Sequence, residues 1–306
     1  MDTQYQVVII GSGPAGLAAG LYAARSRIST LILERETPGG ELMNIDLIEN
    51  YPGYQDGVLG PDLGSSMLMQ ATKFGAELHV AEVKMVVPRT FDNLVRTSQG
   101  DISTKGVIIT SGSHSRKIGV PGEAEFTNKG VFYCATCDGP RFKGKVVAVA
   151  GGGDSGLTEA IFLTGFASKV VVIELLPQLM ANKTLQERVL SNPKIEVMCN
   201  LKIEAIRGLN CVELLELSEM KTGKKSSLKV DGLLVRVGLM ANTGYLKDTL
   251  KMNSIGQVMV NDRMETEIPG IFAAGDVRHN SPMQIVTAVA DGATAALGLL
   301  RYLGYR

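Results

Sequence analysis

The feature that most constrains this fold is a strand, glycine turn and helix pattern that occurs twice. In the first copy, YQVVIIGSGPAGLAAGLYAA, a β-branched apolar run precedes the turn GSGPAG, and small apolar residues follow it at helical spacing. The second copy, GKVVAVAGGGDSGLTEAIFL, repeats this order around GGGDSG. Another apolar run follows each copy, TLILE (30–34) and KVVVIE (169–174). Two βαβ units so far apart predict an α/β protein with two Rossmann-like dinucleotide-binding domains.

Each glycine of the first turn has a separate physical task. Gly11 permits the tight turn, Gly13 lets the backbone approach a pyrophosphate, and Gly16 lets the helix lie close to the strand. The helix behind them offers unpaired N–H groups and a positive dipole end to phosphate. Glu34 ends the next strand, where a carboxylate can accept hydrogen bonds from a ribose. A solvated acid at the end of a strand is the alternative interpretation of Glu34.

Composition and charge exclude several classes of partner. The 306 residues include 31 basic and 31 acidic side chains, so no global field draws the chain to nucleic acid or to an anionic membrane. The first residues read as a buried strand and not as a signal peptide. No window reaches the roughly 18 uninterrupted apolar residues that a membrane span needs. Four cysteines in such a chain favour a reducing cytoplasm, where a CxxC pair is usually catalytic or metal-binding.

One such pair, Cys134 and Cys137, lies in VFYCATCDGPRFKG. It can be a redox pair, half of a zinc site, or two inert buried thiols. Zinc needs about four ligands. The other cysteines, Cys199 and Cys211, form no second CxxC, and no histidine lies at a ligand spacing, so we predict no metal site. The polar, glycine-bounded surroundings favour a redox pair at the start of a helix, whose dipole stabilises a thiolate.

Two aspartates complete the candidate chemistry. Asp138 directly follows the pair, and we expect it to protonate a departing thiolate, with a pKa raised by partial burial. It could also cap a helix. In TEIPGIFAAGDV, Asp276 follows a strand and the Gly275 turn, and the final helix begins near Gln284. An aspartate in that place can bind a hydroxyl group.

Four segments together resemble the low-molecular-weight thioredoxin reductase family of flavoproteins. They are GSGPAG, GGELMNIDLIENYPG (39–53), YCATCDG and TEIPGIFAAGDV, and the resemblance covers almost the whole chain. It implies FAD as cofactor, an FAD-binding domain made of 1–113 and 242–306, and a second domain, 114–241, inserted in it. It also implies a homodimer, with thioredoxin or a thioredoxin-like protein as partner. In that family the residue matching Cys137 faces the flavin, and the one matching Cys134 attacks the substrate disulfide.

The resemblance also implies a set of FAD-binding residues. They lie in the first glycine turn, at the end of the next strand, in the segment after it, and near the end of the chain. The set is Gly11, Gly13, Pro14, Ala15, Gly16, Glu34, Gly40, Glu41, Leu42, Asn50, Gly112, Gly275, Asp276 and Gln284.

The second glycine turn departs from the family. Gly151, Gly153 and Gly156 should cradle a second pyrophosphate. At the end of the next strand, NADPH-using members of the family carry a His-Arg-Arg cluster and a further arginine, which neutralise the 2′-phosphate. The matching positions here are Glu174, Leu175, Leu176 and Met180. Because a carboxylate without any cation repels a 2′-phosphate, we expect NADH or reduced ferredoxin as the electron donor, and not NADPH.

Two further departures affect the cofactor and the donor. The family's Arg-Gln pair near the start of the last helix appears here as Met283-Gln284. The basic stretch KTGKKSSLK (221–229) is either a solvated hairpin tip or a docking site for an acidic donor such as ferredoxin.

The sequence thus predicts a flavin-dependent disulfide reductase that passes electrons from FAD through Cys134 and Cys137 to a small disulfide protein. One alternative is a dithiol oxidase that uses oxygen; such relatives tend to carry a histidine after the CxxC, so Asp138 favours reduction. A flavin redox sensor is the other alternative.

Overall fold

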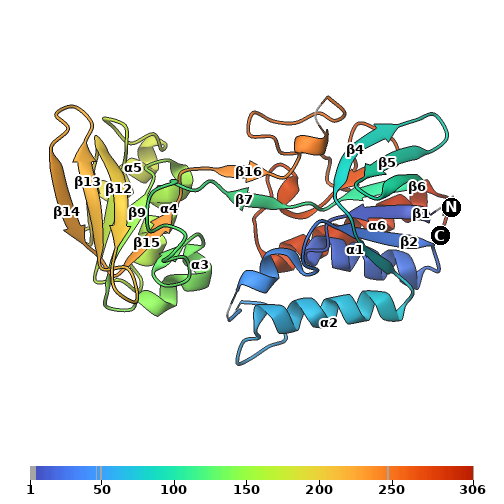
Figure 1. The fold of residues 1–306 in the computed structure, drawn as a ribbon, viewed down its shortest axis with the longest axis horizontal. Coiled ribbons are helices and arrows are strands. Elements are labelled where there is room, and N and C mark those ends of the chain that lie inside the picture. Colours follow the sequence, from blue (N-terminus) through green and yellow to red (C-terminus); the bar gives the residue numbers. More distant parts are fainter. Residues whose placement is uncertain (1–4, 46, 49, 247, 306) are drawn as a thin grey trace. The chain divides into compact units, whose positions relative to one another are not determined.

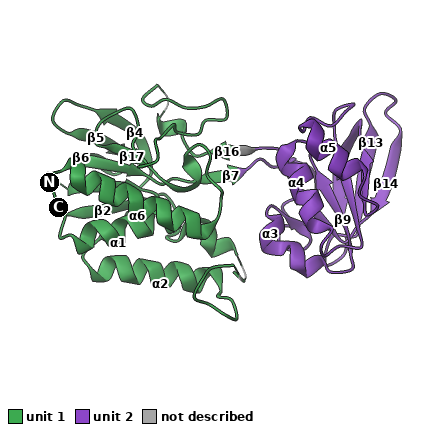
Figure 2. Ribbon diagram, turned by 180° about the vertical axis from the view of Figure 1, so that it is seen from behind, with its two compact units in different colours: residues 1–114, 240–306 green, residues 115–239 purple. Residues whose placement is uncertain are grey.

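A computed structural model describes residues 5–45, 47–48, 50–246 and 248–305 of the chain (Figure 1). The chain forms two compact units, residues 1–114 with 240–306 and residues 115–239 (Figure 2). It passes between them in two short strands that pair with each other, β7 (Ser113–Ser115) and β16 (Leu239–Ala241). The second unit is therefore an insertion in the first.

A seven-stranded sheet forms the centre of the first unit. Its order is β3-β2-β1-β6-β5-β4, and β17 pairs with β6. The strands are β1 (Tyr5–Ile10), β2 (Thr30–Glu34), β3 (Glu77–Val80), β4 (Val83–Pro88), β5 (Asn93–Thr97), β6 (Gly100–Ile109) and β17 (Ile271–Ala273). Because β1 runs parallel to β2 and β6, and β17 runs parallel to β6, the carboxyl ends of these four strands meet at one edge of the sheet.

The helices of this unit are α1 (Pro14–Arg25), α2 (Gly60–Lys73) and α6 (Ile285–Tyr302), with short 3-10 turns η1 (Gly40–Asn44), η3 (Gly244–Leu246) and η4 (Gly275–Val277). Small residues let α1 and α6 pack closely: a Cβ on Gly292 would lie 2.0 Å from the carbonyl oxygen of Ala15. Among the described residues, α6 is the one helix long and apolar enough to cross a membrane by length and composition. Its buried Ala295 and Leu299 belong to the core of the unit, as expected of a core helix.

The alternation of side chains along the strands builds the two faces of the sheet. Val7 and Ile9 point into a core shared with α1 and α6, whereas Val8 and Ile10 belong to a second core with β4 and β5. All four side chains are at most 4% exposed. The period of two in a strand that is buried on both faces thus explains the continuous apolar run VVII.

The second unit has three layers around a parallel sheet of order β11-β10-β9-β15-β8. Helices pack on one face, and the antiparallel sheet β12-β13-β14 packs on the other. The parallel strands are β8 (Val131–Phe132), β9 (Val146–Ala150), β10 (Lys169–Ile173), β11 (Ile195–Met198) and β15 (Gly232–Val235). The other elements are β12 (Leu201–Arg207), β13 (Leu214–Glu219), β14 (Lys225–Lys229), α3 (Ala135–Asp138), η2 (Gly139–Phe142), α4 (Asp154–Leu163) and α5 (Lys183–Leu190).

Both units therefore carry the predicted Rossmann-like α/β arrangement, but local boundaries differ from those read off the sequence. The strand expected from residue 105 begins at Gly100, because its first half pairs antiparallel with β5. In the basic stretch 221–229, Lys225–Lys229 form the edge strand β14, so only the residues before it make the turn.

Candidate active site

The carboxyl edge of the first sheet gathers most of the residues expected to bind FAD. Gly11 follows β1, Gly13 is the N-cap of α1, and Pro14 opens that helix. Gly112 follows β6, and its carbonyl accepts the N–H of Asn242 at 3.0 Å. Gly275 opens η4 one residue after the end of β17 and is followed by Asp276. Open parallel sheets bind ligands at this edge.

Glu34 organises the glycine turn from the end of β2. One of its carboxylate oxygens accepts the N–H of Ser12 at 2.9 Å and the hydroxyl of Ser12 at 2.6 Å. The other accepts the N–H groups of Arg35 and Glu36. Ser12 is fully buried, so this contact fixes the turn from inside. Glu34 is therefore not the freely solvated acid that was the alternative.

The segment after β2 folds back onto the same turn. The N–H of Gly39 donates to the carbonyl of Ser12 at 3.2 Å. Gly40, Glu41 and Leu42 form the first turn of η1, and a Cβ on Gly40 would lie 3.1 Å from the Cα of Gly13. The turn GSGPAG is thus flanked by backbone on this side.

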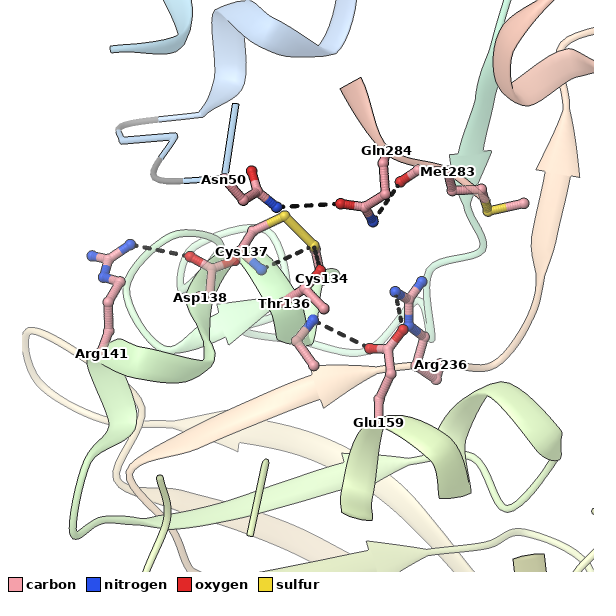
Figure 3. The surroundings of a disulfide bond; sticks show 11 residues. Asn50, Cys134, Thr136, Cys137, Asp138, Arg141, Glu159, Arg236, Met283 and Gln284 are labelled. Carbon is pink, nitrogen blue, oxygen red and sulfur yellow. Dashed lines mark hydrogen bonds and ion pairs between the residues drawn. A yellow bond between two sulfur atoms is a disulfide. The ribbon is translucent and has the colours of Figure 1, made fainter. Parts of the chain in front are cut away.

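The expected set also includes Asp276 in η4, Gln284 at the start of α6, and Asn50, which contacts Gln284. Burial raises the pKa of Asp276, although the Ser281 hydroxyl donates to its carboxylate at 3.0 Å and opposes the shift. Gln284 is the N-cap of α6, and its amide oxygen accepts from the Asn50 amide at 3.2 Å (Figure 3). Met283, which stands where the family has arginine, has a positive φ of 56°.

A buried ion pair supports η4 from α6. The Arg278 guanidinium donates from Nε and Nη2 to the two oxygens of Asp291, at 2.7 and 3.0 Å. Asp291 also accepts the N–H of Gly275 at 3.1 Å. The side chains of Arg278 and Asp291 are only 14% and 9% exposed. This pair holds the Gly275–Asp276 turn in place.

The glycine turn fits a dinucleotide. A Cβ on Gly11 would lie 2.5 Å from the Thr110 carbonyl oxygen, and one on Gly16 would lie 1.9 Å from the Gly11 carbonyl oxygen. A Cβ on Gly13 would meet no atom within 4 Å. Gly11 and Gly16 are therefore required by packing of the protein itself, whereas the space beside Gly13, at the start of α1, is open to a phosphate.

The second sheet repeats this arrangement with the cysteine pair added. Gly151 follows β9, Glu174 follows β10, and Arg236 follows β15. β8, which runs parallel to β15, ends one residue before Tyr133 and leads into Cys134. The parallel order brings the CxxC segment and the second glycine turn to the same edge of this sheet.

Cys134 and Cys137 form a disulfide at the start of α3 (Figure 3). Cys134 is the N-cap, and its Sγ accepts the N–H of Cys137 at 3.2 Å. The hydroxyl of Thr136 lies 3.2 Å from the same sulfur. Hydrogen-bond donors at the start of a helix favour a thiolate, so Cys134 is placed to carry negative charge after reduction.

Asp138 is the last residue of α3, whose N-cap is Cys134. It stands at the N-cap position of η2, but its side chain makes no capping hydrogen bond there. Its side chain is 28% exposed, and its carboxylate accepts from Arg141 at 3.3 Å. It directly follows Cys137 in the chain.

In the second glycine turn, as in the first, a backbone N–H donates to the carboxylate at the end of the following strand. Glu174 is buried, and its carboxylate accepts the N–H groups of Gly152 at 2.6 Å and Leu176 at 2.8 Å. A Cβ on Gly156 would lie 2.1 Å from the Gly151 carbonyl oxygen, and one on Gly153 would meet nothing within 4 Å. Gly153 thus matches Gly13.

The side chains after Glu174 are apolar and exposed. Leu175, Leu176 and Met180 are 48%, 44% and 61% exposed. Leu179 packs inward instead, over Gly152. Asn182 donates to the carboxylate of Asp154, the first residue of α4.

Sequence reasoning missed five residues that organise these sites. Ser12 could have been found because it lies inside the glycine turn. The others are brought in by the fold from remote segments, and no spacing marks them. They are Glu159, Arg236, Arg278 and Asp291.

Comparisons with known proteins agree with this geometry. The family model described as pyridine nucleotide-disulphide oxidoreductase matches residues 5–292. The chain is 41% identical over 300 residues to a thioredoxin reductase of Bacillus subtilis, covering 98% of this chain and 95% of that protein. It is also 41% identical over 303 residues to one of Treponema pallidum, covering 99% and 98%. A crystal structure of thioredoxin reductase from Streptococcus pyogenes matches with a TM-score of 0.93 and 42% identity over 99% of both chains.

A family match over most of the length, an inserted second dinucleotide fold and a CxxC disulfide at a helix start all agree. The chain belongs to the pyridine nucleotide-disulphide oxidoreductases and, within them, to the low-molecular-weight thioredoxin reductases.

Proposed function

We propose that this chain is an FAD-dependent reductase that passes electron pairs through Cys134 and Cys137 to thioredoxin or a similar small disulfide protein. The observation that carries the proposal is the disulfide at the start of α3, with the Cys137 N–H aimed at the Cys134 sulfur. The relatives named thioredoxin reductase support the substrate. Family membership also supports a homodimer, which sedimentation equilibrium would test.

FAD, when bound, supplies two electrons, which together with two protons convert the Cys134–Cys137 disulfide into two thiols. The Cys134 thiolate then attacks the substrate disulfide and forms a mixed disulfide, releasing one substrate thiolate. Cys137 attacks the Cys134 sulfur, which restores the protein disulfide and releases the second substrate thiolate. Asp138, beside Cys137, delivers a proton to the thiolate that departs.

Two cysteine variants test these assignments. Cys137→Ser should keep its flavin and lose disulfide turnover, because Cys134 can form a mixed disulfide that nothing resolves. Cys134→Ser should form no mixed disulfide at all. Cys211→Ser is the matched control, since Cys211 is an exposed free thiol remote in sequence from the pair. Unchanged thioredoxin turnover in Cys137→Ser would remove the assignment.

We infer further that the donor is not NADPH and that NADH or reduced ferredoxin supplies the electrons. The support is the end of β10, where the buried Glu174 carboxylate stands beside the exposed Leu175 and Leu176. A phosphate dianion there would face a carboxylate, and no arginine is present at these positions. A ribose hydroxyl could instead donate to Glu174.

Anaerobic reduction of the flavin separates the donors. NADH, NADPH and reduced ferredoxin are each mixed with the holoenzyme, and the visible absorbance of the oxidised flavin is followed. Rapid bleaching by a low concentration of NADPH would refute the inference.

A gain-of-function variant sharpens this test. Leu175→Arg, Leu176→Arg and Met180→Arg together place three cations on exposed positions, where substitutions change stability by about 0.5 kcal/mol or less. Glu174 is kept because its carboxylate holds the Gly152 N–H. We expect the rate with NADPH to rise in this variant, and a Leu209→Arg change, also on an exposed leucine, to leave it unchanged.

A further inference from the structure

A carboxylate that the proposed electron transfer does not use lies beside the start of α3. Glu159 lies on α4, the helix that begins at the second glycine turn. One of its oxygens accepts the N–H of Ala135 at 3.2 Å, and the other forms an ion pair with Nη2 of Arg236 (Figure 3). Ala135 is the first residue of α3, and its N–H belongs to the peptide that joins it to Cys134. Both oxygens of Glu159 are thus committed.

The contact affects the donors available to the sulfur. The first N–H groups of a helix have no partner within the helix and can serve a thiolate at its N-terminus. Here the N–H of Cys137 points to the Cys134 sulfur, but that of Ala135 points to Glu159. The carboxylate occupies one donor and places a negative charge beside the Cys134–Ala135 peptide, and a nearby like charge disfavours the thiolate.

Arg236 offsets that negative charge. The Arg236 and Glu159 side chains are only 15% and 20% exposed, so water screens their charges weakly. Nε of Arg236 is buried and has no hydrogen-bond partner among the described residues, whereas Nη2 pairs with Glu159. The backbone of Arg236 packs on the glycine turn, since a Cβ on Gly151 would lie 2.2 Å from its carbonyl oxygen.

We propose that Glu159 and Arg236 are positioning residues that set the stability of the Cys134 thiolate with opposite sign. Glu159 destabilises the thiolate and holds the start of α3, and Arg236 stabilises it by neutralising Glu159. Asp138, which directly follows Cys137, accepts a hydrogen bond from Arg141. The inference rests on the proposed redox role of Cys134 and Cys137.

The reaction measured is protein disulfide plus one dithiothreitol dithiol giving protein dithiol plus the cyclic dithiothreitol disulfide, so that two electrons and two protons move to the protein. Glu159→Gln keeps an oxygen for the Ala135 N–H and removes the charge. We expect its thiolate to be stabilised, so that the equilibrium constant for reduction rises about threefold to tenfold, a shift of up to ~30 mV. Arg236→Met leaves the carboxylate unpaired, and the constant should fall by a similar factor.

The second readout is the ionisation of Cys134 itself. In the reduced holoenzyme with Cys137→Ser, alkylation of the Cys134 peptide by iodoacetamide is followed by mass spectrometry between about pH 5 and pH 9. Adding Glu159→Gln should lower the apparent pKa and adding Arg236→Met should raise it. Arg236→Lys keeps the charge and should stay near the parent. Glu187→Gln removes an exposed carboxylate on α5 and should change nothing.

Shifts of the same sign in both variants, or no shift in either, would overturn the proposal, because a purely structural role has no reason to reverse sign. If Arg236→Met fails to fold, the Glu159→Gln shift and the Arg236→Lys rescue decide the matter. Failure of the proposed function is distinct: Cys137→Ser would then retain turnover whatever the thiolate pKa does.

Discussion

In the first glycine turn, the contribution of a glycine to protein stability can be separated from its contribution to FAD binding. Gly13 has φ −69° and ψ −175°, which alanine adopts readily, and its Cβ would meet no atom within 4 Å. Replacing glycine at such a position stabilises by about 0.4–1 kcal/mol through the unfolded chain. Alanine is a poorer N-cap than glycine, which works against that gain by a similar amount. We therefore expect Gly13→Ala to leave the unfolding free energy of the flavin-free protein within about 1 kcal/mol of wild type.

Flavin binding should respond quite differently. If the pyrophosphate lies against the Gly13 backbone, an added methyl group occupies its space and the FAD affinity falls at least about tenfold, or 1.4 kcal/mol. Gly16→Ala is the matched contrast, because its Cβ would lie 1.9 Å from the Gly11 carbonyl oxygen. The helix and turn must separate, which costs about 1–3 kcal/mol or more before any ligand is added.

Urea unfolding of the flavin-free proteins and titration with FAD, followed by quenching of flavin fluorescence, measure the two quantities. We expect Gly13→Ala to lose FAD affinity without losing stability, and Gly16→Ala to lose stability. An unchanged FAD dissociation constant in Gly13→Ala would refute the placement of the phosphate. Loss of more than about 2 kcal/mol of stability in that variant would refute the claim that its surroundings are open.

Two further predictions concern η4. Because burial raises the pKa of Asp276, the flavin-free protein loses stability as pH rises from the ordinary aspartate range through the raised pKa. Asp276→Asn should therefore be more stable than wild type in thermal melts at neutral pH, with the difference vanishing in acid, and should bind FAD less tightly; equal stability at neutral pH would contradict this. Asp291→Ala leaves the buried Arg278 guanidinium without its carboxylate counter-ion and should cost about 3–5 kcal/mol in urea unfolding. Adding Arg278→Met should recover most of that loss, and a double variant as unstable as the single one would show that the charge was not the cause.

The sequence alone predicts the structural features that depend on residues close together in the chain. The two glycine turns, the strands before them and the helices after them are encoded by local apolar periodicity and by steric freedom at single positions. The cap at Cys134 likewise involves residues three apart in the chain. The charge at the end of β10 could also be predicted from the sequence. Glu174 directly follows the apolar run that forms this strand, so its position at the strand end needs no information from remote residues.

Only the tertiary structure shows which charged side chains from remote parts of the chain form pairs. Glu159 and Arg236 are paired because α4 and the end of β15 meet at one edge of a parallel sheet, and Arg278 reaches Asp291 because α6 packs beneath η4. No spacing marks such pairs, since the strand order and the close approach of helices decide which remote side chains meet. Local hydrogen bonding is written in short stretches of sequence, whereas the partners of buried charges depend on the packing of the whole unit.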